Sequence, residues 1–473
     1  MNSIPIKHKR WIQTLFILFL LADLSFSFVQ HYNTPLYGDL ENGILPDKDV
    51  RSIFDDPFGF EKIITGEKGV NPNRFFSHYF FSEYFKNVPL WLQHFVSPIS
   101  SAYLSCAIIK VIVQVFFIFF LSAFISGKTK IFSREFITAA VIITPLFQVY
   151  GYWSRMGIID QSIAYNFFYS IPIVALMLFL SPVFNHVIRN KKIRNTAYLY
   201  LVPLIIILPF SGPLIPALIV IITFLVLIYY WRQSGVGSYL KKVPSVMYIV
   251  LIPASLWSLY SLVLGFYDSN YQSETIPVLA RFLKLPEGIF SQLFHSLGIP
   301  LLLTTIAINI FLIRKLNPQE SVKFINVFKW IGVFAFIYII LLPFGGYRPY
   351  RARIIRYDTI LPVTVALMFY FGATTYYLIN NLKERRKARY YTFIVLVLAI
   401  FTFSDTKGIG KNRCERMALK KIATSQDSVV AISNNCYVMS WSNNFDYKKS
   451  DKKAELLYYW RITKTKKLFY NEQ

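Results

Sequence analysis

Charged residues, and acidic ones above all, are scarce in this 473-residue chain. Only 16% of its residues are charged, and 50 Lys and Arg face just 25 Asp and Glu. Soluble domains typically carry about 25% charged residues, so the composition excludes an ordinary soluble fold. Apolar residues make up 55% of the chain. They form repeated runs of about 20 residues, long enough to cross a hydrocarbon core about 30 Å thick. The sequence therefore predicts an all-α polytopic membrane protein.

Cysteine is also rare, and the three cysteines lack the close pairing of a zinc site. Cys106 lies in a predicted span, where we expect it to serve only in packing. Cys414 and Cys436 lie 22 residues apart in the C-terminal tail. That tail is predicted to face an oxidising compartment, so we predict a disulfide between them. Two unpaired thiols are the alternative.

A signal-peptidase cleavage site of the A-x-A type is absent from the N-terminus, where "SFS" is a weak substitute. The basic head and apolar core of residues 1–30 therefore predict a retained first helix. We predict 11 spans. They cover residues 11–29, 101–126, 136–150, 165–184, 197–211, 212–231, 244–265, 297–313, 330–346, 358–380 and 391–404.

Lys and Arg concentrate in alternate turns between these spans. Together with the N-terminal head, those turns hold 22 Lys and Arg, as in "NNLKERRKAR" and "NHVIRNKKIRN". Such an excess marks cytoplasmic loops. It places the N-terminus in the cytoplasm and the C-terminus outside, and it gives the net charge of +25 a membrane role in place of nucleic-acid binding.

An arginine-rich run then falls on the outer side. "YRPYRARIIRYD" holds Arg348, Arg351, Arg353 and Arg356 beside Tyr357. These arginines cannot be topology signals there. A guanidinium binds phosphate through two parallel hydrogen bonds, so the run predicts a site for a lipid-linked phosphate. Contact with anionic phospholipid head groups and a lock with outer acidic residues are alternatives.

The first outer loop, residues 30–100, is acidic, with nine Asp and Glu against six Lys and Arg. Asp39 follows a glycine close after the first helix, where a catalytic group would meet a membrane-embedded substrate, so it is the favoured functional carboxylate of the loop. The pairs "DLE" and "DKD", the latter with Asp47 and Asp49, could hold Mg²⁺ or Mn²⁺. The alternative is a solvated acidic loop. The later stretch "NRFFSHYFFSEYFKNVPLWLQHF" is typical of an interfacial helix.

Charges are predicted within the membrane and at its outer edge. Asp23 and Lys110 lie at similar depth in the first two spans, which predicts a salt bridge or else a proton or substrate path. Arg155 and Asp160 flank an outer turn. They either pair locally or line the same pocket as the first loop, where Arg155 would join the phosphate site.

The inside N-terminus, the acidic first outer loop with its aromatic segment, and the outer C-terminal tail resemble the GT-C fold of membrane glycosyltransferases. That resemblance implies a polyprenyl-phosphate-linked sugar donor and a catalytic acidic residue in the first outer loop. It points to Asp39 as the catalytic residue, ahead of Glu41 and Asp47. The stretches "GDLENGILPDKDV", "PNRFFSHYFF", "SPISSAYLSCAIIK" and "RARIIRYDTILP" are similar to uncharacterised multipass proteins of Bacteroidota. This similarity implies a bacterial inner membrane.

The sequence thus predicts a transmembrane domain over residues 1–404 and a small extracytoplasmic α/β module over 405–473. In that module we expect strands at "DSVVAIS" and "CYVMSW" and a helix at "KKAELLYYWRI". The predicted function is transfer of a sugar from a lipid-linked donor to a glycan, lipid or protein acceptor at the outer face. The alternatives are a lipid-linked saccharide flippase, a glycan polymerase or ligase, and a non-catalytic scaffold.

Overall fold

The computed structural model describes residues 6–38, 40–151, 156–234, 243–245, 247–268, 276–347, 353–433 and 435–472. Within these ranges, nine helices are long and apolar enough to cross a membrane. The protein is therefore a multi-pass, mainly helical membrane protein. The nine are built from α1 (Ile6–Tyr32), α6 (Pro98–Ser126), α8 (Ile163–Tyr165) with η3 (Asn166–Ser170) and α9 (Ile171–Arg189), α11 (Ile215–Ser234), η6 (Met247–Leu251) with α13 (Ile252–Val263) and η7 (Leu264–Tyr267), α16 (Gly298–Leu316), α17 (Pro318–Leu341) with η9 (Leu342–Gly345), α18 (Tyr357–Asn381) and α19 (Glu384–Ser404).

Shorter helices complete the fold. In the first outer loop these are α2 (Leu40–Ile44), α3 (Lys48–Asp55), α4 (Phe60–Thr65), η1 (Pro72–Arg74) and α5 (Phe75–Leu92). Elsewhere they are α7 (Arg134–Ile143), η2 (Thr144–Leu146), η4 (Asn195–Ala197), α10 (Tyr198–Ile207), η5 (Leu208–Phe210), α14 (Val278–Phe282), α15 (Leu285–Phe294), α20 (Arg413–Thr424), η10 (Tyr447–Ser450) and α21 (Asp451–Tyr459). The described strands are β1 (Val429–Ile432) and β2 (Leu468–Asn471).

Two of the predicted spans are short apolar segments in the structure. The span predicted over 136–150 consists of α7 and η2, which end at residue 146, and the span over 197–211 consists of α10 and η5. Pro145 lies in η2 and Pro209 in η5, and proline cannot donate the next helical hydrogen bond. Nine full-length helices among the described residues are therefore established, and a total of 11 spans stays a prediction.

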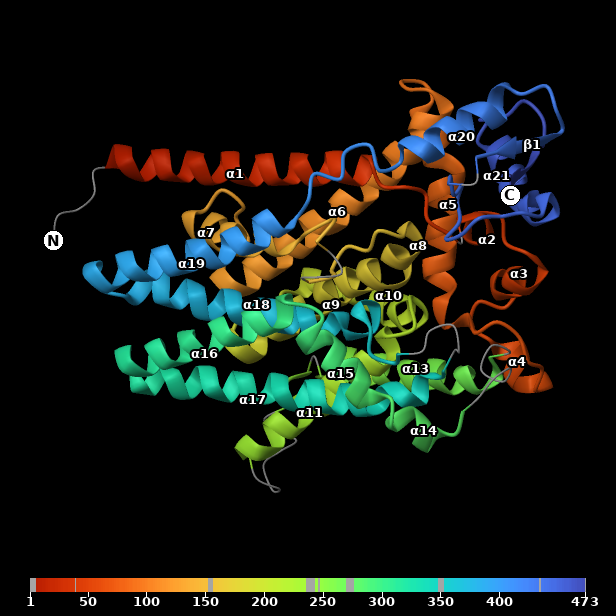
Figure 1. Cartoon of the computed structure of the whole chain (residues 1–473). Coiled ribbons are helices and arrows are strands. Elements are labelled where there is room, and N and C mark those ends of the chain that lie inside the picture. The colour runs from red at the N-terminus through yellow and green to blue at the C-terminus, as the bar shows by residue number, and fades with distance from the viewer. Residues whose placement is uncertain are drawn as a thin grey trace.

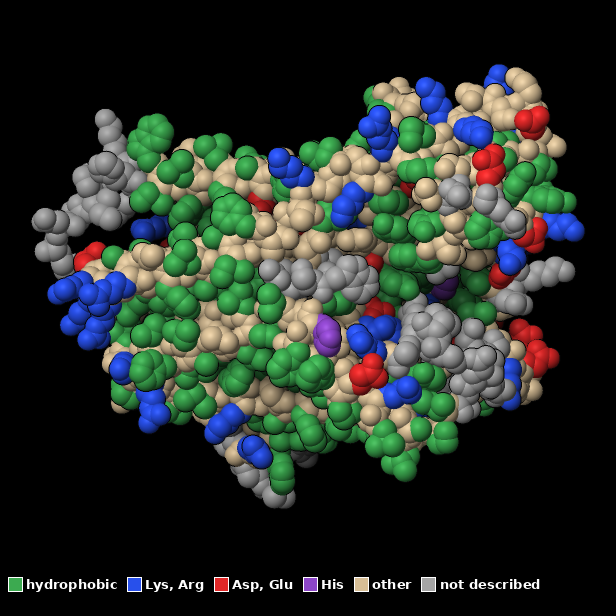
Figure 2. All heavy atoms as spheres, viewed as in Figure 1, with side chains coloured by type: hydrophobic (Ala, Val, Ile, Leu, Met, Phe, Trp, Pro, Cys, Tyr) green, Lys and Arg blue, Asp and Glu red, His purple; other side chains and the backbone are tan. Residues whose placement is uncertain are grey.

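The two ends of the helix bundle differ in character (Figure 1). The start of α1 and the α16–α17 and α18–α19 turns lie at one end, where Lys and Arg gather (Figure 2). We name it the basic end. The first-loop helices and the C-terminal elements α20 and α21 lie at the other, the module end. Helix α5 runs across the bundle there, as expected for an interfacial helix.

The C-terminal residues fold as a small α/β unit. Strand β1 pairs in parallel with β2, and α21 matches the predicted helix. The predicted disulfide is confirmed, because Cys414 and Cys436 are bonded. The prediction of a strand at "CYVMSW" is wrong. Those residues form irregular backbone and a bend that begins at the disulfide. The partner of β1 is β2, almost 40 residues later in the sequence, a pairing that no local pattern reveals.

Glu415 of α20 fastens this module to the bundle. Its Oε2 accepts hydrogen bonds from the Leu36 backbone N–H at 2.8 Å and the Tyr103 hydroxyl at 2.7 Å. Its Oε1 accepts one from the Met439 N–H at 2.9 Å. The guanidinium of Arg416 lies 3.9 Å from the centroid of the Tyr103 ring. Burial raises the pKa of the Glu415 carboxyl, and the bonds from Met439, Leu36 and Tyr103 oppose that rise.

Lys110 does not form the predicted salt bridge with Asp23. Its side chain is buried, and its Nζ donates to the Gln161 carbonyl oxygen at 2.5 Å. Among the residues that the structure describes, no ion pair joins Lys110 to Asp23, whose Oδ2 accepts no hydrogen bond from them. Similar depth in the membrane did not predict the pairing, because the rotation of each helix decides which neighbour a side chain meets.

Replacing Glu415 by alanine should loosen the module from the bundle. The change leaves two buried N–H groups and one hydroxyl without their acceptor, at a cost of about 1–3 kcal/mol each. We expect a lower midpoint of thermal unfolding in detergent and faster trypsin cleavage after residue 405. Glu455→Ala, at an exposed position of the same module, is the matched control. Equal cleavage of both variants and wild type would show that Glu415 does not fasten the module.

Candidate functional site

A cavity of about 480 Å³ lies toward the module end of the bundle. Its walls come from six segments of the chain, most of them far apart in sequence, including the first loop and the arginine-rich run. The lining residues are Asn71, Asn73, Arg74, Tyr169, Pro213, Leu214, Ala217, Leu259, Leu262, Val263, Gly265, Phe266, Asp268, Tyr338, Leu341, Leu342, Phe344, Gly345, Gly346, Tyr347, Arg353, Ile354, Arg356 and Thr359.

The lining divides by chemistry. Residues of α11, α13 and α17, all candidate membrane spans, contribute mainly aliphatic side chains. The loops contribute the charged groups, namely Arg74, Asp268, Arg353 and Arg356. The cavity is therefore apolar along the spanning helices and polar where the loops of the module end close it. A ligand with one charged end and one apolar end matches this division.

The residues that follow α17 favour a turn at the cavity. The segment "LLPFGGYR" ends α17 in the short helix η9, and Gly346 has φ 94°, a conformation that favours glycine. Helix α18 then begins after Arg356, whose N–H donates to the Thr359 hydroxyl at 2.8 Å. Asp358 lies in the first turn of α18, where a negative charge is favoured by the helix dipole.

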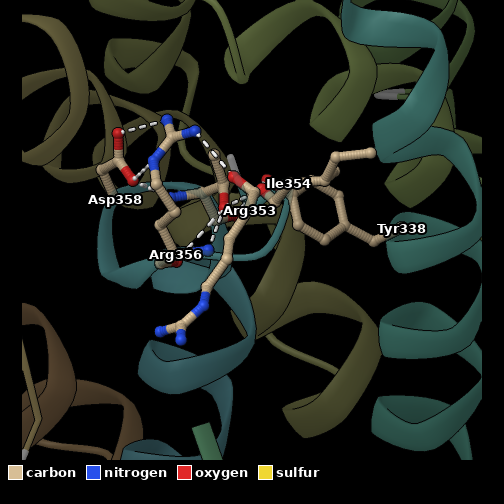
Figure 3. Close-up of polar contacts among 6 residues, drawn as sticks. Tyr338, Arg353, Ile354, Arg356 and Asp358 are labelled. Atoms are coloured by element: carbon tan, nitrogen blue, oxygen red, sulfur yellow. Dashed lines mark hydrogen bonds and ion pairs between the residues drawn. The ribbon is translucent and has the colours of Figure 1, made fainter. Parts of the chain in front are cut away.

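Arg356 is held in place by Asp358. Its Nε and Nη2 donate to the two carboxylate oxygens at 3.0 and 2.8 Å, a bidentate pair, and its Nη1 donates to the Arg353 carbonyl oxygen at 3.2 Å (Figure 3). The Asp358 side chain is 7% exposed and that of Arg356 27%. The guanidinium is thus fixed at the cavity wall with its charge largely balanced by Asp358.

Arg353 is held more loosely. Its Nε donates to Glu287 of α15 at 3.0 Å and its Nη1 to the Ser291 hydroxyl at 2.7 Å. The side chains of Arg353 and Glu287 are 45% and 54% exposed. Figure 3 shows the Arg353 guanidinium pointing away from the Arg356–Asp358 pair. Its third nitrogen, Nη2, donates to no partner that the structure describes, so Arg353 keeps donors for an anionic ligand.

The first outer loop reaches the cavity through η1. Arg74 lines it, with its guanidinium 5.9 Å from the centroid of the Phe168 ring, and Asn71 and Asn73 lie beside it. Burial, with a further contribution from Arg74, lowers the pKa of His78 to about 3, so this histidine is neutral near pH 7 and adds no charge.

Backbone pairing joins that loop to the chain after α13. Gly69 forms a parallel bridge with Asp268, and its N–H donates to the Tyr267 carbonyl oxygen at 3.0 Å. This bridge brings the Asp268 carboxylate and Arg74 to one cavity.

The predicted first-loop carboxylates have different surroundings. Asp39 lies outside the described residues, as does the side chain of Asp49. Glu41 is buried in α2, and Asp47 caps α3 by accepting from the Val50 N–H while pairing with Lys452 at 3.0 Å. Those bonds, the Val50 N–H first, lower the pKa of Asp47. Neither Glu41 nor Asp47 lines the cavity.

The predicted phosphate-site residues are only partly described. Arg353 and Arg356 line the cavity, whereas Arg155, Arg348 and Arg351 lie outside the described residues. Tyr357 is the first residue of α18 and is not part of the lining. It packs against Gly157, where a Cβ would lie 2.6 Å from the tyrosine ring.

Metal binding stays a prediction. Within the described ranges, no three His, Cys, Asp or Glu residues come together as a metal site. Asp47 pairs with Lys452, and the side chain of Asp49 lies outside the described residues. The Mg²⁺ or Mn²⁺ site predicted at these two residues therefore stays a prediction.

Two charged lining residues were not singled out from the sequence, Arg74 and Asp268. The turn "GVNPNRFF" around Arg74 carries an Asn-Pro-Asn signal for a shaped loop, and "GFYDSN" ends a predicted span with an acid. Each signal is common by itself. Only the folded chain brings these residues to the cavity that also contains Arg353 and Arg356.

No family model, curated protein or solved structure matches this chain. A functional assignment therefore rests on the geometry of the site.

The two described arginines of the run should differ in their effect on stability. Arg356→Ala removes the bidentate partner of the buried Asp358 carboxylate and should cost about 3 kcal/mol. Arg353→Ala breaks an exposed pair and should cost less than about 1 kcal/mol. Thermal unfolding in the same detergent measures both. A larger loss for Arg353→Ala would contradict this account of the two ion pairs.

Proposed function

We propose that the protein is a membrane glycosyltransferase that binds a polyprenyl-phosphate-linked sugar in this cavity. The observation that supports it most is the combination of aliphatic walls from α11, α13 and α17 with three arginines at the polar end. A polyprenyl phosphate has one long apolar chain and one anionic group, and arginine binds phosphate through paired hydrogen bonds. The GT-C resemblance adds the sugar and the transfer reaction.

The proposed orientation follows from charge. The basic end, with the turns rich in Lys and Arg, faces the cytoplasm, and the module end faces the extracytoplasmic side of a bacterial inner membrane. The disulfide between Cys414 and Cys436 agrees with that assignment, because disulfides persist in oxidising compartments. The cavity then receives its donor from the outer leaflet.

The proposed reaction divides the work between cations and a carboxylate. An acceptor hydroxyl attacks the anomeric carbon, the bond from that carbon to the phosphate oxygen breaks, and the lipid phosphate leaves with the bonding electrons. Arg74 and Arg353 stabilise the charge on the leaving phosphate. A carboxylate accepts the hydroxyl proton. Asp268 is the carboxylate among the described lining residues of the cavity, and Asp39 is the first-loop candidate from the resemblance.

A flippase of lipid-linked saccharides is the second proposal, since it would also bind the lipid phosphate. It requires a polar path that continues from the cavity to the basic end. The lining from α11, α13 and α17 is mainly aliphatic and contains no Lys, Arg, Asp or Glu, which favours an enzyme that works at one face. A polymerase or ligase fits the same arginines without a first-loop carboxylate.

Lipid-phosphate binding is the first test. Purified wild type should retain a polyprenyl phosphate in native mass spectrometry. Arg74→Gln and Arg353→Gln should each weaken binding about 10- to 100-fold, because each removes a charge-assisted hydrogen bond worth about 1.5–3 kcal/mol. Arg413→Gln is the matched control, since Arg413 is exposed at the same end of the protein and does not line the cavity.

Competition with other phosphate compounds shows whether the site prefers a polyprenyl phosphate. Inorganic phosphate and phosphatidylglycerol should displace the polyprenyl phosphate weakly. Equal binding of phosphatidylglycerol would identify the arginines as contacts for ordinary head groups and would contradict the proposal. So would equal retention of the polyprenyl phosphate by all three variants.

Transfer activity distinguishes the carboxylates. In a sugar-transfer assay with donors that bind, Asp268→Asn or Asp39→Asn should lower kcat about 100- to 10,000-fold, the range expected for loss of a general base. Asp47→Asn should leave kcat close to wild type, because Asp47 is a helix cap paired with Lys452. Full activity of both the Asp268 and the Asp39 variants would exclude a carboxylate-assisted transfer at this site.

A further inference from the structure

The partner of Arg353 carries a charge that the proposed reaction does not use. Glu287 lies on α15 and is not part of the cavity lining, yet its Oε1 accepts a hydrogen bond from Arg353 Nε at 3.0 Å. Arg353 itself lines the cavity. A negative charge therefore lies next to one of the arginines that we assign to the lipid phosphate.

The packing of α15 keeps Glu287 beside Arg353. Gly288 is buried, and a Cβ at this position would lie 2.7 Å from the Cβ of Ile355, which is two residues after Arg353 in the sequence. Helix α15 thus packs directly on the backbone that follows Arg353. Glu287 cannot move away from this arginine as a unit with its helix unless the arginine-rich run moves as well.

Arg353 can bind a phosphate while it keeps both of its partners on α15. A guanidinium has five N–H donors, one on Nε and two on each Nη. Glu287 accepts from Nε, and the Ser291 hydroxyl accepts one hydrogen bond from Nη1 at 2.7 Å. Further donors on Nη1 and Nη2 form the edge that binds a phosphate through two parallel hydrogen bonds. The guanidinium then lies between the Glu287 carboxylate and the phosphate.

The charge of the lipid phosphate changes in the proposed reaction. In the donor, the phosphate is a diester of the sugar and the polyprenol, with one negative charge. After the sugar has been transferred, the lipid phosphate is a monoester with a charge of about −1.5 to −2 at pH 7. Repulsion by a neighbouring carboxylate is proportional to that charge, so it is stronger for the product than for the donor.

We propose that Glu287 sets the charge preference of the phosphate site. It allows Arg353 to hold the singly charged donor and weakens the binding of the doubly charged lipid phosphate, which favours release of the product. Glu287 is a specificity residue and takes no part in bond breaking. This inference rests on the proposed function, because it requires a lipid phosphate at Arg353.

Two lipids with the same tail and different charge provide the test. Polyprenyl phosphate and its methyl phosphodiester are compared by native mass spectrometry of the full-length protein at pH 8, where the monoester has close to two charges. Glu287→Gln removes the charge and keeps an acceptor for Arg353 Nε. The variant should bind polyprenyl phosphate about tenfold more tightly than wild type does, and the methyl diester only about threefold more tightly.

Two further variants separate the effect of charge from an effect on structure. Glu287→Asp keeps the charge, so the ratio of its affinities for the two lipids should stay within about twofold of the wild-type ratio. Glu455→Gln removes an exposed carboxylate of the C-terminal module, away from the cavity lining, and should change neither affinity.

Product inhibition gives a second readout. In the sugar-transfer assay, polyprenyl phosphate should inhibit Glu287→Gln at a concentration about tenfold lower than it requires for wild type, because the variant holds the product more tightly. Equal or weaker inhibition of the variant would contradict a role for Glu287 in product release.

The binding results distinguish this inference from the proposed function. The role of Glu287 would be overturned, and the lipid-phosphate site retained, if Glu287→Gln bound both lipids as wild type does while Arg353→Gln bound them more weakly. An equal gain for both lipids would also overturn it, because the effect would not depend on the charge of the ligand. If wild type bound neither lipid, this inference and the proposed function would both be wrong.

Discussion

The cost of placing polar and charged groups in hydrocarbon determines where chemistry can occur in this protein. A charge near the middle of a bilayer is expensive, so Lys and Arg collect in the turns of the basic end. Most described acidic groups lie at the module end or in ion pairs there, such as Asp47 with Lys452. Among the described residues of the spanning helices, Asp23, His31 and Lys110 are ionisable groups that lie within a span in spite of that cost. The same constraint is consistent with the polar lining of the cavity, which lies where loops of the module end meet the bundle.

The module end is assembled by contacts between distant parts of the chain. Glu415 and the Cys414–Cys436 disulfide fix the C-terminal unit, while Gly69 ties the first outer loop to residues after α13. These links surround a cavity whose walls come from spanning helices and whose polar groups come from loops. Loops held by a rigid scaffold are where binding residues commonly lie. The site is therefore a product of the packing of loops on the bundle, and no single motif contains it.

The sequence predicts those features that local pattern controls. Apolar runs located the spanning helices, the tail composition indicated an α/β module, and Cys414 and Cys436 were correctly paired. Pro145 and Pro209 explain why two predicted spans are short. The pattern could not reveal the pairing of β1 with β2, nor that Lys110 meets Gln161 and not Asp23, because both depend on how distant elements rotate against each other.

The candidate site likewise combines residues that the sequence could indicate with residues that only folding brings together. Arg353 and Arg356 could be found from the sequence because four arginines cluster in one short run between two apolar stretches. Arg74 and Asp268, in contrast, are ordinary loop residues until the chain folds. The most direct measurement is an experimental structure of the protein in a lipid nanodisc with a polyprenyl phosphate. The account predicts density for the phosphate within hydrogen-bond distance of Arg74 and Arg353. It predicts density for the polyprenyl tail between α13 and α17. The account would be contradicted if the phosphate bound elsewhere and the space between these arginines were empty or held a phospholipid.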